Sequence, residues 1–172
     1  MEGQNEVQKI KTQGSNGENN EESPTKFNCR GLRYPATVLE LKQLLIANNP
    51  DVVFLCEIKM HSNNFTCIQN QCRMAECLAV SSEGHSGGLA MLWKDGVNVT
   101  IQNYSSHHID SLVRMESHNN IRFTGFYGHA DLNLRSRPWD ILRIVRISVR
   151  EDWILGGDFN AVTYKAQKER TN

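Results

Sequence analysis

The chain has 172 residues, 39% of them hydrophobic and 22% charged, which is enough for one domain with a sizeable core. Its 19 basic and 19 acidic residues balance to a formal net charge of zero. No apolar run approaches the length of a membrane span, and the acidic N-terminus resembles neither a secretory signal nor a transit peptide, so we expect a nuclear or cytoplasmic protein that does not contact membranes.

Residues 1–24 form a polar leader that ends at Pro24. Five glutamates and two lysines give this leader a net charge of −3, which leaves +3 on residues 25–172. The leader has too little apolar surface to offset the entropy of ordering, so we predict that it is disordered. The mild positive excess on the remainder is compatible with a nucleic-acid partner.

The first two elements after the leader are a helix and a buried strand. Val38, Leu41 and Leu45 recur at helical spacing after Pro35, which predicts a helix over 36–48. Residues 51–57 are almost continuously apolar, as in a strand buried on both faces. This strand ends in Glu57, and a buried carboxylate requires a cation, a hydrogen-bond network or an open cleft.

The middle of the chain is rich in strands. The alternation of Leu89, Met91 and Trp93 predicts a half-buried strand, and the turn Lys94-Asp95-Gly96 predicts a hairpin with the strand that follows. The other elements expected in this region are a weak helix over 65–76 and strands over 78–80, 97–102, 109–115 and 121–127.

Pro138 begins a further helix that we expect to reach about residue 151. Its apolar stripe consists of Trp139, Leu142, Val145 and Val149. Arg143, Arg146 and Arg150 form a separate basic edge. We interpret this edge as a solvated face, with DNA contact as the alternative.

The last informative stretch is 152–160. Trp153, Ile154 and Leu155 predict a buried strand, which Gly156 and Gly157 end. Asp158 and Asn160 follow two residues apart, so both side chains can point into one site at the carboxyl end of the strand. Because Gly, Asp and Asn are also turn residues, a simple turn is the alternative.

Several patterns suggest other chemistry. Five cysteines are an odd number without a secretory context, which indicates reduced thiols, and the absence of tight Cys-x-x-Cys pairs argues against a zinc site. Gly84-His85-Ser86-Gly87-Gly88 fits the nucleophile elbow of serine hydrolases, but that motif must lead into a helix and here a strand is predicted. The adjacent His107 and His108 alternate faces on a strand and are interpreted as core or surface residues.

Polar groups therefore stand at the ends of apolar strands or in adjoining turns: Asn28, Glu57, Tyr127, Asp158 and Asn160. These groups suit phosphodiester cleavage. Glu57 could hold Mg²⁺, and Asp158 could align or deprotonate the attacking water. Tyr127 and Asn160 could hydrogen-bond the phosphoryl oxygens. His129, close to Tyr127 in sequence, is a candidate DNA contact or a structural loop residue.

The chain resembles the endonuclease/exonuclease/phosphatase superfamily in five segments that occur in family order: 28–32, 50–59, 87–93, 125–128 and 156–160. The amino-acid sequences of 28–32 and 127–130 are most similar to those of endonuclease domains of plant LINE-type (non-LTR) retrotransposons. The resemblance implies a four-layered α/β sandwich with mixed, mostly antiparallel sheets and outer helices, and a hydrolase that nicks DNA with one or two Mg²⁺ ions. It places Asn28 and Glu57 near the metal, Tyr127 on the phosphate, and Asp158 with Asn160 around the attacking water.

Two departures from the family pattern matter. Ser23–Phe27 stands where the family has a hydrophobic strand ending in Trp-Asn, so we expect that strand to be short or lost. The family's late Ser-Asp-His motif, whose His is central to catalysis, does not occur in these residues, and 25–172 resembles about the first two-thirds of the domain. We therefore expect low or no activity from this chain alone. The alternatives are a non-catalytic remnant that binds nucleic acid weakly and a phosphatase-type member of the superfamily.

Overall fold

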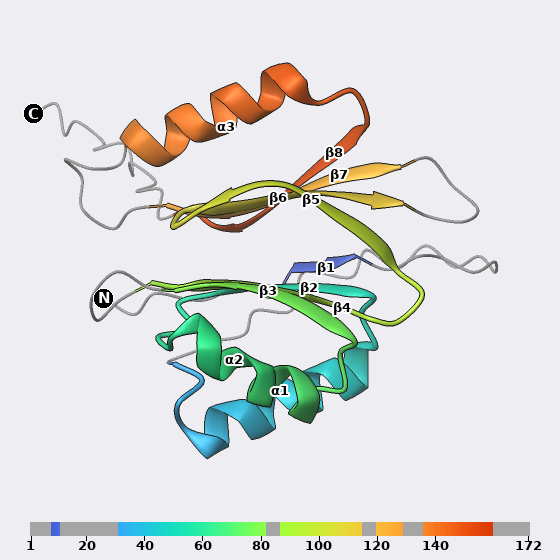
Figure 1. Cartoon of the computed structure of the whole chain (residues 1–172), viewed down its shortest axis with the longest axis vertical. Coiled ribbons are helices and arrows are strands. Elements are labelled where there is room, and N and C mark those ends of the chain that lie inside the picture. The colour runs from blue at the N-terminus through green and yellow to red at the C-terminus, as the bar shows by residue number, and fades with distance from the viewer. Residues whose placement is uncertain (1–7, 11–30, 82–86, 115–119, 129–135, 160–172) are drawn as a thin grey trace, which may run out of the picture.

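A computed structural model of the chain describes residues 8–10, 31–81, 87–114, 120–128 and 136–159, and two sheets pack face to face in it between outer helices (Figure 1). The first sheet is antiparallel throughout, in the order β1 (Gln8–Ile10), β2 (Val52–Cys56), β4 (Leu89–Trp93), β3 (Glu76–Val80). The second has the order β5 (Asn98–Ser105), β6 (His108–Arg114), β7 (Ile121–Tyr127), β8 (Asp152–Asp158), with only its β7–β8 pair parallel.

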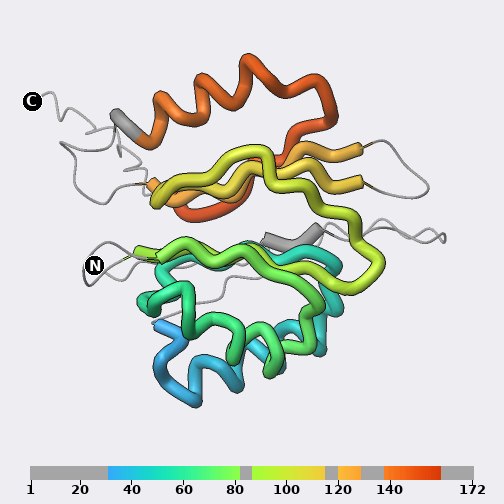
Figure 2. Tube along the Cα trace, in the orientation of Figure 1, coloured from blue at the N-terminus to red at the C-terminus, as the bar shows by residue number. Residues whose placement is uncertain are grey.

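The helices form the two outer layers. The first sheet is covered by α1 (Pro35–Asn48), the short η1 (Ser62–Asn64) and α2 (Phe65–Gln71), whereas α3 (Ser136–Ser148) covers the second, as the trace in Figure 2 also shows. This arrangement confirms the predicted mixed, mostly antiparallel α/β fold with helices packed outside. Within the described residues, no helix is long and apolar enough to cross a membrane.

Two hydrophobic cores result from this layering, and β2 contributes to both. Val53 and Leu55 pack against α1 and α2, while Val52, Phe54 and Cys56 face the second sheet. All five residues of β2 are buried, which explains the continuous apolar run in its sequence.

The prediction that β4 is half-buried is wrong, because all five of its residues are buried. β4 lies between β2 and β3 in the first sheet. Ala90 and Leu92 belong to the core beneath the helices, while Leu89, Met91 and Trp93 belong to the core between the sheets. The two faces of β4 therefore lie in two different apolar environments.

The predicted hairpin at Lys94-Asp95-Gly96 is also wrong. The turn connects the two sheets, because β4 pairs with β2 and β3, whereas β5 pairs with β6. A glycine turn reverses the chain without requiring that its flanking strands pair. The ammonium of Lys94 donates to the Asn49 backbone oxygen at 2.9 Å and to Asp51 Oδ1 at 3.2 Å, which fastens the turn to the end of α1.

The disorder predicted for residues 1–24 is wrong for Gln8–Ile10, which form β1 and pair antiparallel with Val52–Phe54 of β2. An edge strand presents unpaired backbone groups, which a polar segment can pair with even where it has few apolar side chains to bury. The remaining residues of the leader lie outside the described part of the chain.

β8 differs from its predicted form in two ways. It continues through both glycines to Asp158, and Ile154 is 38% exposed because β8 lies at an edge of its sheet in the described structure. On the neighbouring α3, Leu142 and Val145 are buried. The basic side chains Arg143, Arg146 and Arg150 are exposed, which agrees with a solvated face and equally with a DNA contact.

The two sheets approach closely at Gly125, where an added β-carbon would lie 2.3 Å from the Phe54 ring. We expect Gly125→Ala to lower the free energy of unfolding by about 1–3 kcal/mol through overpacking. In a Phe54→Leu background the same substitution should cost much less, as measured by urea unfolding. Gly96→Ala, in a turn with open space around it, should cost the same in both backgrounds. Additive effects of Gly125→Ala and Phe54→Leu would contradict this account.

Candidate active site

Glu57 directly follows the buried strand β2 and has a left-handed backbone conformation, with φ of 53°. Lys59 is also left-handed, with φ of 49°. Such conformations cost roughly 1–2 kcal/mol each for non-glycine residues, so surrounding contacts must maintain them. Two do so: Ile58 N donates to Gly88 O at 3.2 Å, and Lys59 N donates to Gly87 O at 3.1 Å.

Gly87 and Gly88 have φ of 90° and 84°, which glycine adopts readily. They lead directly into β4, so the strand–turn–helix context of a nucleophile elbow is absent at this position. The glycines at the end of Gly84–Gly88 instead support the backbone that presents Glu57.

Tyr127 ends β7 in the opposite sheet and reaches across to Glu57. Its hydroxyl donates to Glu57 Oε1 at 2.7 Å. The ammonium of Lys59 lies 4.0 Å from Glu57 Oε2, and the Glu57 side chain retains 20% exposure. The carboxylate at the end of β2 therefore has the hydrogen-bond partner that its sequence position required, and it remains accessible from outside.

Asp158 is the register partner of Tyr127 in the parallel pair β7–β8. Side chains that are directly paired across a sheet project from the same face, so both residues face the end of β2. The strand ends are joined by Gly128 N, which donates to Asp158 O at 2.7 Å. A β-carbon on Gly128 would lie 2.3 Å from Phe159 O, so only glycine permits this approach.

The pKa of Tyr127 is raised well above that of an ordinary tyrosine. Burial is the largest cause, followed by the hydrogen bond to Glu57 and the negative charges of Glu57 and Asp158. Each of these effects opposes a third negative charge at the site, so the phenol stays protonated and acts as a hydrogen-bond donor.

His107 lies beside Tyr127, a position that the sequence did not indicate. Tyr127 N donates to His107 O at 2.7 Å, and His107 Nδ1 lies 3.2 Å from Tyr127 O. The next residue, His108, is buried, with its Nδ1 2.7 Å from Ser105 Oγ. His107 thus fixes the backbone at the end of β7, whereas His108 belongs to the interior.

Among the predicted site residues, Glu57, Tyr127 and Asp158 lie at one end of the two sheets. Asn28, His129 and Asn160 fall outside the described residues, so their roles stay predictions. The described part of the chain contains no group of three or more His, Cys, Asp or Glu side chains able to hold a metal ion. The oxygen donors of Glu57 and Asp158 are nevertheless of the type that Mg²⁺ prefers.

We expect Tyr127 to make stability fall at alkaline pH. Above about pH 10 the unfolded chain ionises this phenol while the folded chain keeps it protonated, so the free energy of unfolding decreases as pH rises. Tyr127→Phe should show a shallower decline between about pH 9.5 and 11.5 in urea unfolding. Tyr104→Phe, at a tyrosine that is 56% exposed, is the matched control for the loss of one phenol hydroxyl. Equal slopes for wild type and Tyr127→Phe would exclude the raised pKa.

Solved structures that share this fold include two TDP2 proteins and a bacterial 3′ phosphatase. The chain is 16% identical to truncated TDP2 from Caenorhabditis elegans, covering 77% of this chain and 59% of that chain with a TM-score of 0.50. It is 20% identical to a humanized D. rerio TDP2, covering 72% of this chain and 55% of that chain with a TM-score of 0.52. It is 17% identical to the 3′ phosphatase NExo from Neisseria, whose structure is bound to product DNA hairpin, covering 70% of this chain and 51% of that chain with a TM-score of 0.51. The chain thus spans between half and three-fifths of the length of these structures.

No curated protein matches the sequence significantly. The Endonuclease/Exonuclease/phosphatase family model matches residues 27–169, which is most of the chain and includes Glu57, Tyr127 and Asp158. Since the match extends over both sheets and the fold agrees with it, the chain belongs to the endonuclease/exonuclease/phosphatase family.

Proposed function

We propose that the domain to which these residues belong hydrolyses DNA phosphodiester bonds with the help of Mg²⁺. The observation that supports this most directly is the bond from Tyr127 to Glu57, which brings together groups from the two sheets, with Asp158 alongside. Two carboxylates and a protonated phenol at one end of a sandwich can bind a cation, orient water and donate to a phosphate oxygen.

In this proposal Glu57 and Asn28 hold one or two Mg²⁺ ions. The fit rests on the Glu57 carboxylate, which is partly exposed and has oxygen donors suited to a hard cation. When bound, the metal would offset negative charge on the phosphate and its leaving oxygen.

The other groups have separate roles. Asp158 aligns the attacking water or accepts its proton, and Asn160 hydrogen-bonds the phosphoryl oxygens. Tyr127 has a single hydroxyl proton, and in this structure that proton makes the hydrogen bond to Glu57. It therefore orients Glu57, and it can donate to a phosphoryl oxygen only by leaving that carboxylate. His129 is proposed as a DNA contact.

Two other functions compete with this one. One is a non-catalytic remnant that binds nucleic acid weakly, which applies if the protein lacks Ser-Asp-His, the motif that supplies the family's catalytic His and that does not occur in these 172 residues. A phosphatase-type activity fits the same carboxylates and phenol, since a phosphate monoester also presents non-bridging phosphoryl oxygens.

We also propose a retrotransposon origin. The support is the sequence of 28–32 and 127–130, which resembles plant LINE-type endonuclease domains. Genomic sequence adjoining the coding region tests this origin: a continuation through Ser-Asp-His into a reverse transcriptase would support it, and an unrelated flanking gene would contradict it.

We expect the chain to bind Mg²⁺ through Glu57. Glu57→Gln keeps the shape of the side chain but removes its charge. It should weaken Mg²⁺ affinity by more than about a hundredfold, which exceeds the roughly 10–100-fold cost of losing a hydrogen-bond partner outside the ligand shell. Isothermal titration calorimetry measures this directly. Glu40→Gln, at an exposed position on α1, is the matched control and should bind like wild type. Identical isotherms for Glu57→Gln and wild type would refute the assignment of the metal.

We expect no appreciable nicking of supercoiled plasmid by these 172 residues alone, because absence of one positioned catalytic group costs about 10²–10⁴ in rate. The assay compares wild type, Glu57→Gln and Glu40→Gln in Mg²⁺, with a 3′-phosphorylated oligonucleotide as a second substrate. Robust nicking that Glu57→Gln abolishes would contradict the expected inactivity. Phosphate release without nicking would favour the phosphatase alternative.

A further inference from the structure

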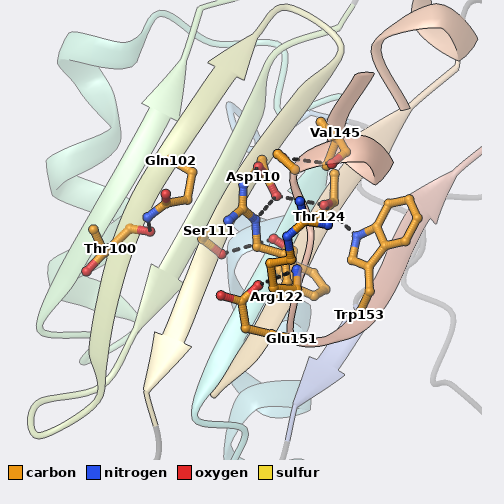
Figure 3. A network of polar contacts seen from close by, with 12 residues as sticks. Thr100, Gln102, Asp110, Ser111, Arg122, Thr124, Val145, Glu151 and Trp153 are labelled. Carbon is orange, nitrogen blue, oxygen red and sulfur yellow. Dashed lines mark hydrogen bonds and ion pairs between the residues drawn. The ribbon is translucent and has the colours of Figure 1, made fainter. Parts of the chain in front are cut away.

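A buried polar network ties three strands of the second sheet together on the face beneath α3 (Figure 3). Arg122 donates to both oxygens of Asp110, from Nε at 2.9 Å and from Nη2 at 2.6 Å. Thr124 Oγ1 donates to Asp110 Oδ1 at 2.8 Å. Trp153 Nε1 of β8 donates in turn to Thr124 Oγ1 at 2.9 Å.

The network lies on the opposite side of the sheet from the core between the sheets. Phe123 belongs to that inner core, so its neighbours Arg122 and Thr124 project the other way. Phe126, on the same outer face, packs against Trp139 of α3 in a tilted arrangement with ring centroids 5.5 Å apart. The network is therefore separate from Glu57, Tyr127 and Asp158.

Thr124 connects the ion pair to β8. Its hydroxyl donates a hydrogen bond to Asp110 and accepts one from Trp153. One side chain on β7 therefore connects β6 with β8. A buried ion pair contributes little net stability, because removing both charges from water offsets their attraction. Asp110 is 1% exposed and Arg122 8%, so this desolvation is nearly complete. Such groups can instead specify one arrangement among several of similar energy.

The arrangement that needs specifying is the register of β8. Between Trp153 and Asp158 the strand contains Gly156 and Gly157, which have no side chains to lock against β7, and Ile154 is partly exposed. A slip of one residue would turn Asp158 to the other face of the sheet. A slip of two would move it about 6.6 Å along the strand, away from Tyr127.

We propose that Thr124, held by Asp110 and Arg122, is a positioning residue that sets the β7–β8 register through Trp153 and so keeps Asp158 beside Tyr127. Its catalytic consequence rests on the proposed function, whereas the register itself does not. The register has its own marker, because Gly128 N donates to Asp158 O at 2.7 Å. Tyr127 N, one residue earlier, donates to His107 O and serves as an internal reference that does not involve β8.

Amide hydrogen exchange by NMR tests the proposal in the full chain. Thr124→Val should raise exchange at Gly128 relative to Tyr127 roughly tenfold, the equivalent of losing one hydrogen bond, while Thr124→Ser should retain the wild-type ratio. The matched control is Ser111→Ala, which removes a buried hydroxyl that donates to Phe123 O at 3.1 Å outside this network. It should change both amides alike.

Trp153→Phe removes the same link while leaving Asp110, Arg122 and Thr124 intact, and it replaces Thr124→Val should that variant fail to fold. A wild-type exchange ratio in the folded variant would overturn the proposal. Calorimetry with Mg²⁺ on the same proteins tests the proposed metal function separately from the register assignment. A changed exchange ratio in a chain that binds no Mg²⁺ would retain the register assignment and reject the proposed metal function.

Discussion

The bond between Tyr127 and Glu57 is the contact on which the candidate site depends, because it joins the ends of two different sheets at 2.7 Å. It can form only where those sheets pack closely. β2 achieves this by burying both faces, one beneath the helices and the other against the second sheet. Opposite it, Gly125 leaves room for the Phe54 ring. The position of the carboxylate is thus a consequence of core packing as much as of its own loop.

The local backbone adds a second constraint. Glu57 and Lys59 are both left-handed, and the carbonyls of Gly87 and Gly88 hold the segment between them. Strain of this kind persists only when neighbouring structure over-determines it, and it is concentrated at functional sites. If β2 continued straight, the alternation of its side chains would direct Glu57 to the face of Val53 and Leu55, beneath the helices. The turn instead directs it to the seam between the sheets, where Tyr127 can reach it.

The sequence predicted elements whose signal was local. The helical spacing in 36–48 and the apolar run of β2 predicted those elements closely, and the strands expected over 109–115 and 121–127 agree with β6 and β7. Polar residues at strand ends identified Glu57, Tyr127 and Asp158 as neighbours. The errors arose where tertiary pairing decides. A glycine turn does not reveal that its flanking strands join different sheets, and Gln8–Ile10 pairs through backbone groups that side-chain patterns do not report. The role of His107 was hidden because its contact with Tyr127 is largely through the backbone.

The candidate site therefore depends on two kinds of interaction, apolar burial and directional hydrogen bonds. Apolar burial between the sheets brings β2 to β7, but it is non-directional and does not by itself set the register of a strand. The position of β8 depends on directional bonds instead, since its glycines allow close approach but offer no side chains to interlock. A displacement of about 1 Å can cost a hundredfold in catalysis, and hydrophobic packing alone does not fix an edge strand to that accuracy. A buried polar network that contributes little to stability is consistent with this need for directional contacts at β8.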